Sequence, residues 1–327
     1  MKRFPMLRTG LISAVALGAT LLSGGVLAQS YPEKPISTMV SYSPGGATDF
    51  QARLVTMMAA DEKLLGQPIV ILNKAGAGGQ VGWNWFAEQA GKDGYDLAAY
   101  NIPHFIAQSI VFDTKYNIDN LEPIANWGAD PAVLIVGKES PFNSATDLVE
   151  YAKKNPGKVT VSGAGLYVGH HIAMLQLQKA AGIELKYIPT KGGVDALQYV
   201  MGGQVMAGFN NLSDAYRSQD RLKIIAIADL ERDKDFIPQV PTFKEQGIDV
   251  DDSSVNFRGL MAPKGTPEPV LAYLAERVPP MFNHKKAVKK MHEGGSPMRV
   301  MTREQVKEMW QKRQAYLTEL LADLRKK

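Results

Sequence analysis

Short apolar runs alternate with helical patterns along most of the chain. The runs are rich in Val, Ile and Leu and are bounded by turn-forming residues, which predicts strands. They lie at 36–42, 69–72, 95–100, 132–136, 158–162, 185–188, 205–209 and 223–228. Helical patterns lie between most of them, for example at 145–154 and 194–201. This alternation predicts an α/β fold whose sheets are mainly parallel and are covered by helices on both faces.

The pattern changes after residue 250. A strand is expected at 255–261, and Thr266 and Pro267 then predict a helix with an N-cap followed by proline at its first position. Thr302 and Gln305 have the spacing of a capping box. The helix that this box opens has one apolar stripe, formed by Val306, Met309, Trp310, Tyr316, Leu317, Leu320 and Leu324. Such a stripe is sufficient to pack the helix on a core.

Three of the expected strand-to-helix turns are rich in glycine. They lie at 41–49, 74–80 and 162–171, and the helix after the first is expected to place Phe50, Leu54, Met57 and Met58 on one face. A helix that begins at such a turn directs free backbone N–H groups and the positive end of its dipole outward, which favours an anion. Glycine also permits tight turns without any ligand. Three such turns at the same end of their strands favour a shared cleft for an anionic ligand.

The first residues have the pattern of a secretory signal peptide. Lys2, Arg3 and Arg8 precede an apolar run at 11–22, and small residues end at Ala28. The run is too short for a comfortable membrane span, so we expect cleavage near Ala28 and a periplasmic location rather than an anchor. The whole chain has 37 basic and 33 acidic residues, and removal of those three cations leaves it near neutrality. This balance gives no indication of a nucleic acid or a membrane surface as partner.

Motifs for catalysis or metal binding are missing from the sequence. The chain has no cysteine, which excludes disulfides and thiol chemistry. It has no phosphate-binding P-loop, no G-x-S-x-G and no H-E-x-x-H. Residues 76–82 approximate a dinucleotide loop followed by an acid at Asp96, but the third glycine is one residue late. His170 and His171 are adjacent, so on a helix they diverge by about 100° and cannot both face one metal. We expect no enzyme, no cofactor and no metal site.

Four polar residues leave two interpretations open. His104 and His170 fall near the expected cleft and either line the ligand or pack as ordinary polar residues. Asp49 either stabilises its helix through the dipole or bonds a ligand hydroxyl, amine or ordered water. Arg258 interrupts an apolar strand, so it is either an outward, solvated side chain or a bidentate clamp on a ligand carboxylate.

A set of short motifs in a fixed order resembles one protein family. The first part has Tyr-Pro-Glu-Lys-Pro-Ile at 31–36, Ser-Pro-Gly-Gly-Ala-Thr-Asp at 43–49, Leu-Gly-Gln-Pro at 65–68, Asn73, Gly-Ala-Gly-Gly at 76–79 and Asp-Gly-Tyr at 93–95. The second has Ser-Gly-Ala-Gly at 162–165, Gly-His at 169–170, Lys-Gly-Gly at 191–193, Gly-Gly-Gln-Val at 202–205 and Val-Pro-Thr at 240–242. Over nearly the whole mature chain, these motifs resemble the Bug-type extracytoplasmic solute receptors of tripartite tricarboxylate transporters.

The resemblance implies a two-lobed periplasmic-binding-protein fold with two crossing hinge strands. We expect a signal peptide at 1–28, one lobe at 29–126 with 257–327, the other at 127–256, and hinge strands near 122–136 and 249–262. The expected ligand contacts are Ser43, Gly45, Gly46, Ala47, Thr48, Asp49, Ala77, Gly78, Gly79, His104, Ser162, Gly165, His170, Asn210 and Arg258. The sequence departs from relatives at Lys74-Ala75 and at Phe257-Arg258-Gly259.

The function implied by this resemblance is capture of a small organic carboxylate, such as a di-, tri- or aromatic carboxylate. The receptor, expected to be a monomer without nucleic acid, would pass the ligand to membrane permease subunits. An alternative is a sensor that presents the same ligand to a signalling system.

Overall fold

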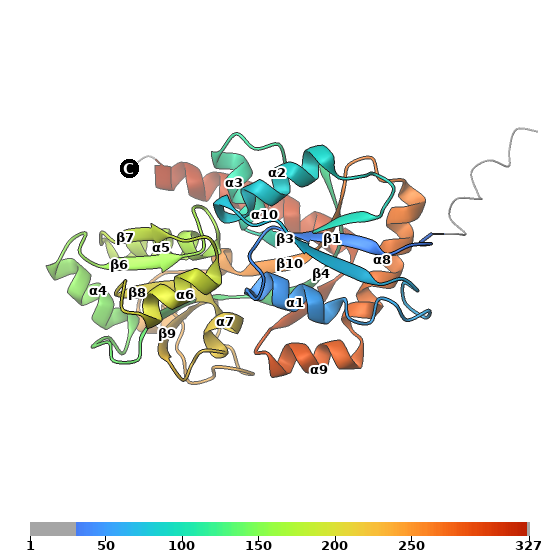
Figure 1. Ribbon diagram of the computed structural model, residues 1–327. Helices are drawn as coiled ribbons and strands as arrows, with labels where there is room; N and C mark the ends of the chain where they lie inside the picture. Colours follow the sequence, from blue (N-terminus) through green and yellow to red (C-terminus); the bar gives the residue numbers. More distant parts are fainter. Residues whose placement is uncertain (1–30, 326–327) are drawn as a thin grey trace, which may run out of the picture. The chain divides into compact units, whose positions relative to one another are not determined.

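The computed structural model describes residues 31–325, and the expected signal peptide lies outside this range. Residues Pro32–Lys327 form one compact unit. Within the described residues, the strands form a six-stranded sheet in the order β11-β4-β10-β3-β1-β2 and a five-stranded sheet in the order β7-β6-β8-β5-β9. The two sheets, each with its own helices, make two lobes (Figure 1). We call the lobe of the larger sheet the first lobe and the other the second lobe.

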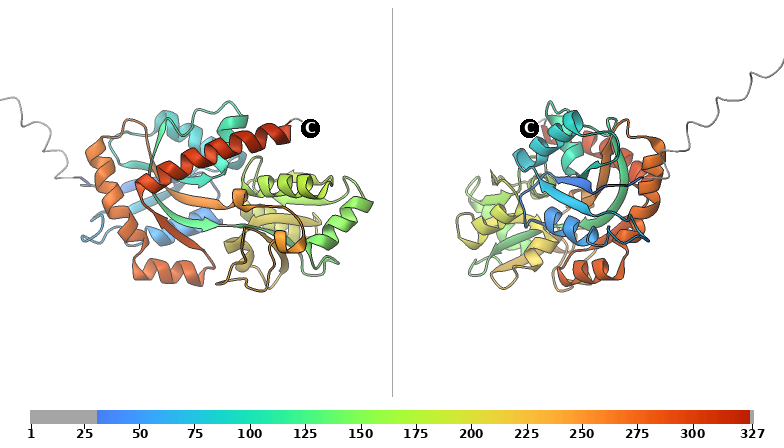
Figure 2. Two further views of the ribbon diagram at one scale, coloured as in Figure 1. Left: turned by 180° about the vertical axis from the view of Figure 1, so that it is seen from behind. Right: turned by 45° about the vertical axis from the view of Figure 1, so that its right-hand side comes forward.

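The first lobe takes its strands from both ends of the chain. They are β1 (Ile36–Val40), β2 (Ile69–Asn73), β3 (Asp96–Ile102), β4 (Leu121–Asp130), β10 (Asn256–Pro263) and β11 (Met298–Met301). Its helices are α1 (Ala47–Val55), α2 (Gln80–Gln89), α3 (His104–Val111), α8 (Glu268–Phe282), α9 (Lys285–Glu293) and α10 (Arg303–Arg325), with a 3-10 turn at Ala77–Gly79. The long helix α10 lies across this lobe in the view from behind (Figure 2).

The second lobe is continuous in sequence. Its strands are β5 (Ala132–Gly137), β6 (Thr160–Gly163), β7 (Lys186–Pro189), β8 (Ala207–Asn211) and β9 (Leu222–Ala228). Its helices are α4 (Ala145–Lys154), α5 (Gly169–Ala181), α6 (Gly193–Met201) and α7 (Leu212–Tyr216), and 3-10 turns follow at Lys244–Gln246 and Asp252–Ser254. The chain enters this lobe between Asp130 and Ala132 and returns to the first lobe at β10.

The second sheet is covered on both faces, as its sequence pattern predicts. Leu134 and Val136 of β5 belong to a core that includes Leu148 of α4. Val133 and Ile135 of the same strand belong to a second core on the opposite face. This alternation follows from the two-residue period of a strand, and it buries β5 on both sides.

The prediction of mainly parallel sheets is wrong, because both sheets are mixed. Parallel pairs join β1 to β2 and β3, and β6 to β7 and β8. The remaining pairs, which involve β4, β5, β10 and β11, are antiparallel. The chain crosses between the sheets near β4–β5 and again before β10, and these crossing strands run against their neighbours. The alternation of strands and helices along the sequence does not show where the chain crosses between the sheets.

The helix starts were predicted with mixed success. Helix α4 has a capping box between Ser144 and Asp147, and α10 begins after the reciprocal pair Thr302 and Gln305. The predicted start of α8 is wrong by one residue, because its N-cap is Pro267, and the Thr266 hydroxyl instead donates to the Pro263 carbonyl.

The apolar face predicted for the first helix is also wrong. Helix α1 buries Gln51, Ala52 and Val55 completely, while Met57 is 47% exposed. The buried Gln51 side chain forms hydrogen bonds with residues of both lobes. The buried face of α1 is therefore held by these bonds as well as by the apolar Ala52 and Val55.

Candidate functional site

A cavity of about 30 Å³ lies between the two lobes at the starts of several helices. The first lobe lines it with Ser43, Gly46, Ala47 and Thr48, which form the β1–α1 turn. Tyr42, His104 and Asn256 complete that side, and the second lobe contributes Ala164, His170, Gly192, Gly193, Val194, Asp195, Asn211 and Asp214. The cavity is small and is walled by both lobes.

The β1–α1 turn owes its shape to Asp49, which does not line the cavity. The Asp49 carboxylate accepts hydrogen bonds from the Gly45 backbone N–H at 2.9 Å, the Asn73 amide at 2.9 Å and the Arg53 guanidinium. Burial opposes its charged form, but the Arg53, Gly45 and Asn73 donors outweigh burial and lower the pKa of Asp49. Gly45 itself has φ +83°, a backbone conformation that favours glycine. Asp49 therefore supports the turn from within the first lobe.

The second and third glycine turns meet each other at the edge of the cavity. A Cβ added to Gly165 of the second lobe would lie 2.8 Å from the Gly78 Cα atom of the first lobe. The Gln108 amide donates to the carbonyls of both Gly78, at 3.1 Å, and Leu166, at 3.0 Å, so it bridges the lobes. Ala77, Gly78, Gly79 and Gly165, all predicted as ligand contacts, lie outside the cavity lining.

Two predicted histidines do face the cavity. His104 and His170 are 3% and 1% exposed, and the Nε2 atom of each has no hydrogen-bond partner among the described residues. The Ala164 backbone N–H donates to His170 Nδ1 at 3.1 Å, and the Tyr42 hydroxyl lies 2.6 Å from His104 Nδ1. Burial lowers the pKa of His104 well below its ordinary value and that of His170 to about 4. Both rings are therefore neutral near pH 7.

Ser162 and Asn210 lie behind the cavity and position helix α6. The Ser162 hydroxyl donates to the Ala196 carbonyl at 2.8 Å, and the Asn210 amide donates to the Gly193 carbonyl at 2.9 Å. Both side chains are fully buried. Their hydrogen bonds fix the first turn of α6, which carries the Gly193 and Asp195 part of the lining.

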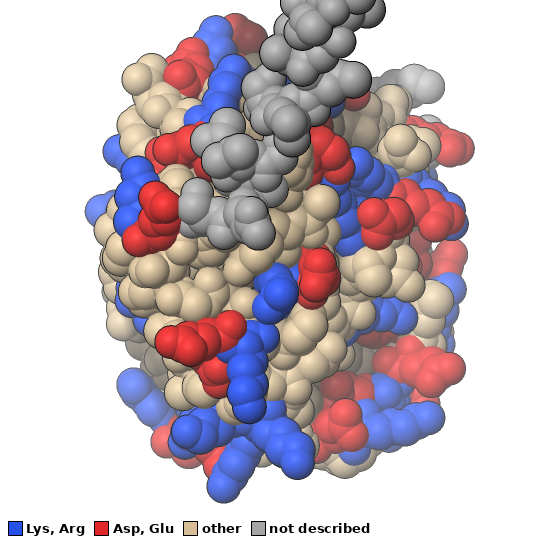
Figure 3. Space-filling model, turned by 90° about the vertical axis from the view of Figure 1, so that its right-hand side faces the viewer, with Lys and Arg blue, Asp and Glu red and all other residues tan. Residues whose placement is uncertain are grey.

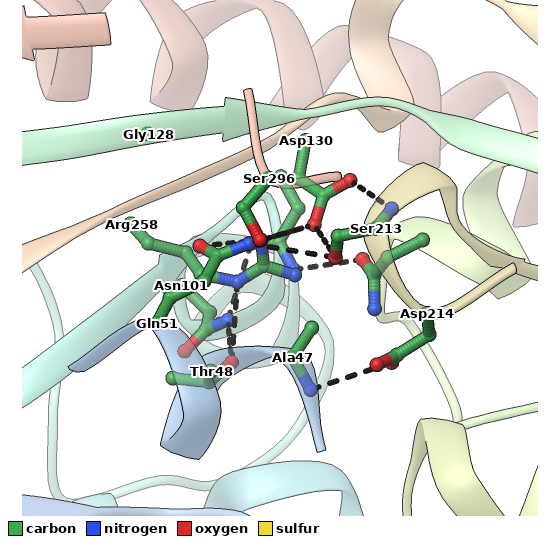
Figure 4. Close-up of polar contacts among 12 residues, drawn as sticks. Ala47, Thr48, Gln51, Asn101, Gly128, Asp130, Ser213, Asp214, Arg258 and Ser296 are labelled. Atoms are coloured by element: carbon green, nitrogen blue, oxygen red, sulfur yellow. Dashed lines mark hydrogen bonds and ion pairs between the residues drawn. The ribbon is translucent and has the colours of Figure 1, made fainter. Parts of the chain in front are cut away.

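Arg258 belongs to a buried ionic network between the lobes (Figure 4). Its Nη1 lies 2.6 Å from Asp130 Oδ2 and 3.2 Å from Gln51 Oε1, and its Nε donates to the Thr48 hydroxyl. The Asp130 carboxylate also accepts from the Ser213 backbone N–H and hydroxyl. The interpretation of Arg258 as a solvated side chain is wrong. Its guanidinium pairs with Asp130 and does not line the cavity, so its effect on the site passes through Thr48 and Ser213.

The sequence prediction missed the second-lobe side of the lining around α6 and α7. The Lys-Gly-Gly motif at 191–193 precedes a helical pattern, so it is a fourth glycine-rich turn that could have been grouped with the other three. Asp214 follows the polar end of β8, and it accepts a hydrogen bond from the Ala47 backbone N–H at 3.3 Å. Its other carboxylate oxygen pairs with Arg217, and burial raises the pKa of Asp214. No local pattern marks a contact across lobes.

The surface and the remaining side chains add three observations. Basic and acidic side chains are interspersed over the face shown in Figure 3, with basic ones gathered toward its lower edge. Among residues 31–325, no group of three or more His, Cys, Asp and Glu could hold a metal ion. None of the helices in that range is long and apolar enough to cross a membrane.

Comparison with known proteins gives consistent matches over most of the chain. The model of the tripartite tricarboxylate transporter family receptor matches residues 52–324. The chain is 34% identical to the "UPF0065 protein in gbd 5'region" of Cupriavidus necator over 270 residues, which is 81% of this chain and 80% of that protein. It is 29% identical to the protein BugT of Bordetella pertussis, over 92% of this chain and 93% of that one.

Solved structures show the same fold. A structure described as a periplasmic transporter has a TM-score of 0.82 at 30% identity and covers 89% of this chain and 97% of its own. The protein MatC of Rhodopseudomonas palustris, solved with bound malate, has a TM-score of 0.81 at 27% identity and covers 89% of this chain and 99% of its own.

Proposed function

Because the chain belongs to the family of tripartite tricarboxylate transporter receptors, we propose that it captures a small organic carboxylate in the periplasm and delivers it to a membrane permease of that type. It is a solute-binding receptor and not an enzyme. The bound malate of the MatC relative supports the carboxylate class, and the chain's own cavity supports it independently.

The observation that carries this proposal is the convergence of helix starts on the cavity. Helices α1, α3, α5 and α6 begin at or next to the lining residues Ala47, His104, His170 and Gly193. Each N-terminus offers free N–H groups and roughly half a positive charge, so together they hold an anion without a basic side chain. A ligand carboxylate at this position can accept hydrogen bonds from backbone N–H groups of both lobes only when the lobes are closed.

Binding then proceeds through closure of the two lobes. We place the hinge in the crossing segments, which the sequence predicts near 122–136 and 249–262. The contacts of Ala47 with Asp214 and of Gln108 with Leu166 belong to the closed arrangement. Ligand shifts the population toward this state because only this state engages both sides of the ligand.

The test is calorimetry on protein that has been unfolded and refolded to remove ligand retained from the host. A panel of di-, tri- and aromatic carboxylates is titrated beside the corresponding amides. We expect saturable binding and a raised Tm with at least one carboxylate, and none with its amide. Amides that bind as tightly as the acids would overturn carboxylate recognition, and uptake that does not depend on the permease would overturn delivery.

A further inference from the structure

The cavity lining has an unusual charge composition for a site that takes an anion. Asp195 and Asp214 both line it, and among the described residues no lysine or arginine does. Asp214 is 5% exposed, whereas the Asp195 carboxylate is half-buried and has no hydrogen bond or ion pair to any described residue. A dicarboxylate in this cavity would place its second negative charge near these two side chains.

Two arginines contact residues of the lining, and both are paired with carboxylates. Arg217 pairs with Asp214 and also donates to the Gly294 carbonyl at 3.1 Å. Arg258 is fully buried against Asp130 and does not line the cavity, although its Nη2 has no hydrogen-bond partner among the described residues. Neither guanidinium can turn toward a ligand without leaving a carboxylate unpaired, which is costly in a buried environment. Among the lining residues, the helix N-termini are therefore the positive groups, and they suit one carboxylate.

The two cavity histidines add one donor and one acceptor. His170 accepts the Ala164 N–H on Nδ1, so the proton of its neutral ring lies on Nε2, which is a donor. The Tyr42 hydroxyl contacts both the Gly78 carbonyl, at 3.0 Å, and His104 Nδ1, at 2.6 Å. Both contacts are hydrogen bonds only when Tyr42 donates to Gly78 and His104 Nδ1 donates to Tyr42. His104 Nε2 is then an acceptor, and neither Nε2 atom has a partner among the described residues.

The lining thus offers contacts to two different groups of a ligand. A carboxylate can accept hydrogen bonds from the helix N-termini and from His170 Nε2. A protonated amine next to it can donate to His104 Nε2 and is attracted by Asp195, in the first turn of α6, and by Asp214, which contacts the start of α1. Resting on the proposed carboxylate function, we propose that the ligand carries an ammonium group beside its carboxylate, and that Asp214 selects for this group.

The experiment compares acids that differ only in the amino group. Propionate and alanine, succinate and aspartate, glutarate and glutamate, and 3-phenylpropionate and phenylalanine are titrated by calorimetry into refolded protein at pH 7.5. For the skeleton that fits, we expect the amino acid to bind at least tenfold more tightly than its partner without nitrogen. Partners without nitrogen that bind as tightly or more tightly would overturn the inference and leave the proposed function intact. If no member of any pair binds, the inference fails, and the wider panel of di-, tri- and aromatic carboxylates decides the proposed function.

Two variants test whether Asp214 and Asp195 cause the preference for the amino group. Asp214→Asn keeps the shape of the side chain and is expected to reduce the amino preference at least tenfold, with a smaller reduction for Asp195→Asn. Asp220→Asn, which removes an exposed carboxylate of the same lobe outside the cavity, is the matched control and should leave the preference unchanged. Should Asp214→Asn fold poorly by circular dichroism, Asp195→Asn still decides. An amino preference that survives in both folded variants would overturn the role of these residues.

Discussion

Asp214 Oδ2 of the second lobe accepts a hydrogen bond from the backbone N–H of Ala47, the first residue of helix α1 in the first lobe. A carboxylate of the protein therefore uses part of the same helix terminus that suits a ligand carboxylate. At a second contact between the lobes, Gly78 and Gly165 bring the two backbones together. Both contacts join the lobes, and each can be tested separately.

Substitution of Gly165 by Ala is expected to hinder closure. The added Cβ would lie 2.8 Å from Gly78 Cα, and φ at this residue is +134°, so the lobes cannot meet without movement of the backbone. We expect a loss of ligand affinity of at least tenfold, measured by calorimetry. Small-angle scattering should show less contraction upon ligand addition than in the parent.

Gly203→Ala is the control for backbone strain. Gly203 also lies in the second lobe with φ of +68°, but nothing lies within 4 Å of a Cβ at this position. This variant is expected to lose some stability and to keep parental affinity. Equal affinity losses in the two variants would show that strain, and not the contact with Gly78, causes the effect.

Removal of the Arg258 side chain is expected to destabilise the protein strongly. Arg258→Met leaves the carboxylate of Asp130 buried without its ion-pair partner, which costs about 3–5 kcal/mol in comparable sites. Urea unfolding gives this value directly. Lys312→Met is the matched control, because its ion pair with Glu308 is exposed and should contribute about 1 kcal/mol or less. A loss for Arg258→Met no larger than the control would contradict the structural role of the network.

Asp49→Ala is expected to lower stability by about 1–3 kcal/mol, since the Gly45 N–H and the Asn73 amide lose their acceptor. The pair with Arg53 adds little because the Arg53 side chain is half exposed. Ligand affinity falls with it, because the turn that lines the cavity loses its shape. Asp113→Ala, at an exposed position, should change neither quantity. An Asp49→Ala protein as stable as the parent would remove Asp49 from this role.

Stability is expected to fall as the pH is lowered from about 6.5 toward 4. Burial lowers the pKa of both His170 and His171 to about 4, below the ordinary value of 6.5 that applies to the unfolded chain. Between these values the unfolded state binds more protons than the folded state, so acid favours unfolding. The full contribution is present above pH 6.5. The expected loss is on the order of 1–2 kcal/mol for each histidine at pH 5.

Urea unfolding at pH 7.5 and pH 5.0 checks this sign. The difference between the two conditions should shrink in His170→Gln, whose amide can still accept the Ala164 N–H. Carboxylates with lowered pKa, such as Asp49, lose their contribution only below about pH 4 and do not obscure this window. Asp214 and Asp229, whose pKa values burial raises, bind protons more readily in the folded state and oppose this loss. A pH difference in His170→Gln as large as that of the parent would therefore contradict the prediction.

Local signals predicted much of the fold. Residue pattern and caps placed α4 and the start of α10, and most of the strands fall within a few residues of their expected positions. Residue pattern did not predict β4, because Pro123, Asn126 and Gly128 interrupt it, and this region was expected only as part of the hinge strand near 122–136 that the resemblance implies. The strand β11 was not predicted, and among the described strands it pairs only with β4. These segments are strands because they pair with distant segments, and such pairing produces no periodic pattern in the sequence.

The candidate site was predicted in the same uneven way. Glycine turns and strand ends indicated Ser43, the Gly46–Thr48 segment, His104 and His170, because these features are local. Asp214 and Arg258 could not be placed correctly, since their roles come from partners across the lobes, Ala47 and Asp130. The alternation of a strand allows the side chain of Arg258 to face solvent. In the structure it is completely buried and forms an ion pair with Asp130.

The order of the strands along the chain has a consequence for how the protein is made. The strands described for the second sheet all lie between residues 132 and 228, whereas the first sheet needs β10 and β11, at 256–263 and 298–301. In synthesis from the N-terminus, the lobe that begins second is therefore the first to have all its strands. The first lobe stays open at β3 and β4 until β10 arrives and pairs with both. Premature release of the chain before residue 256 would leave one finished lobe attached to an unfinished sheet.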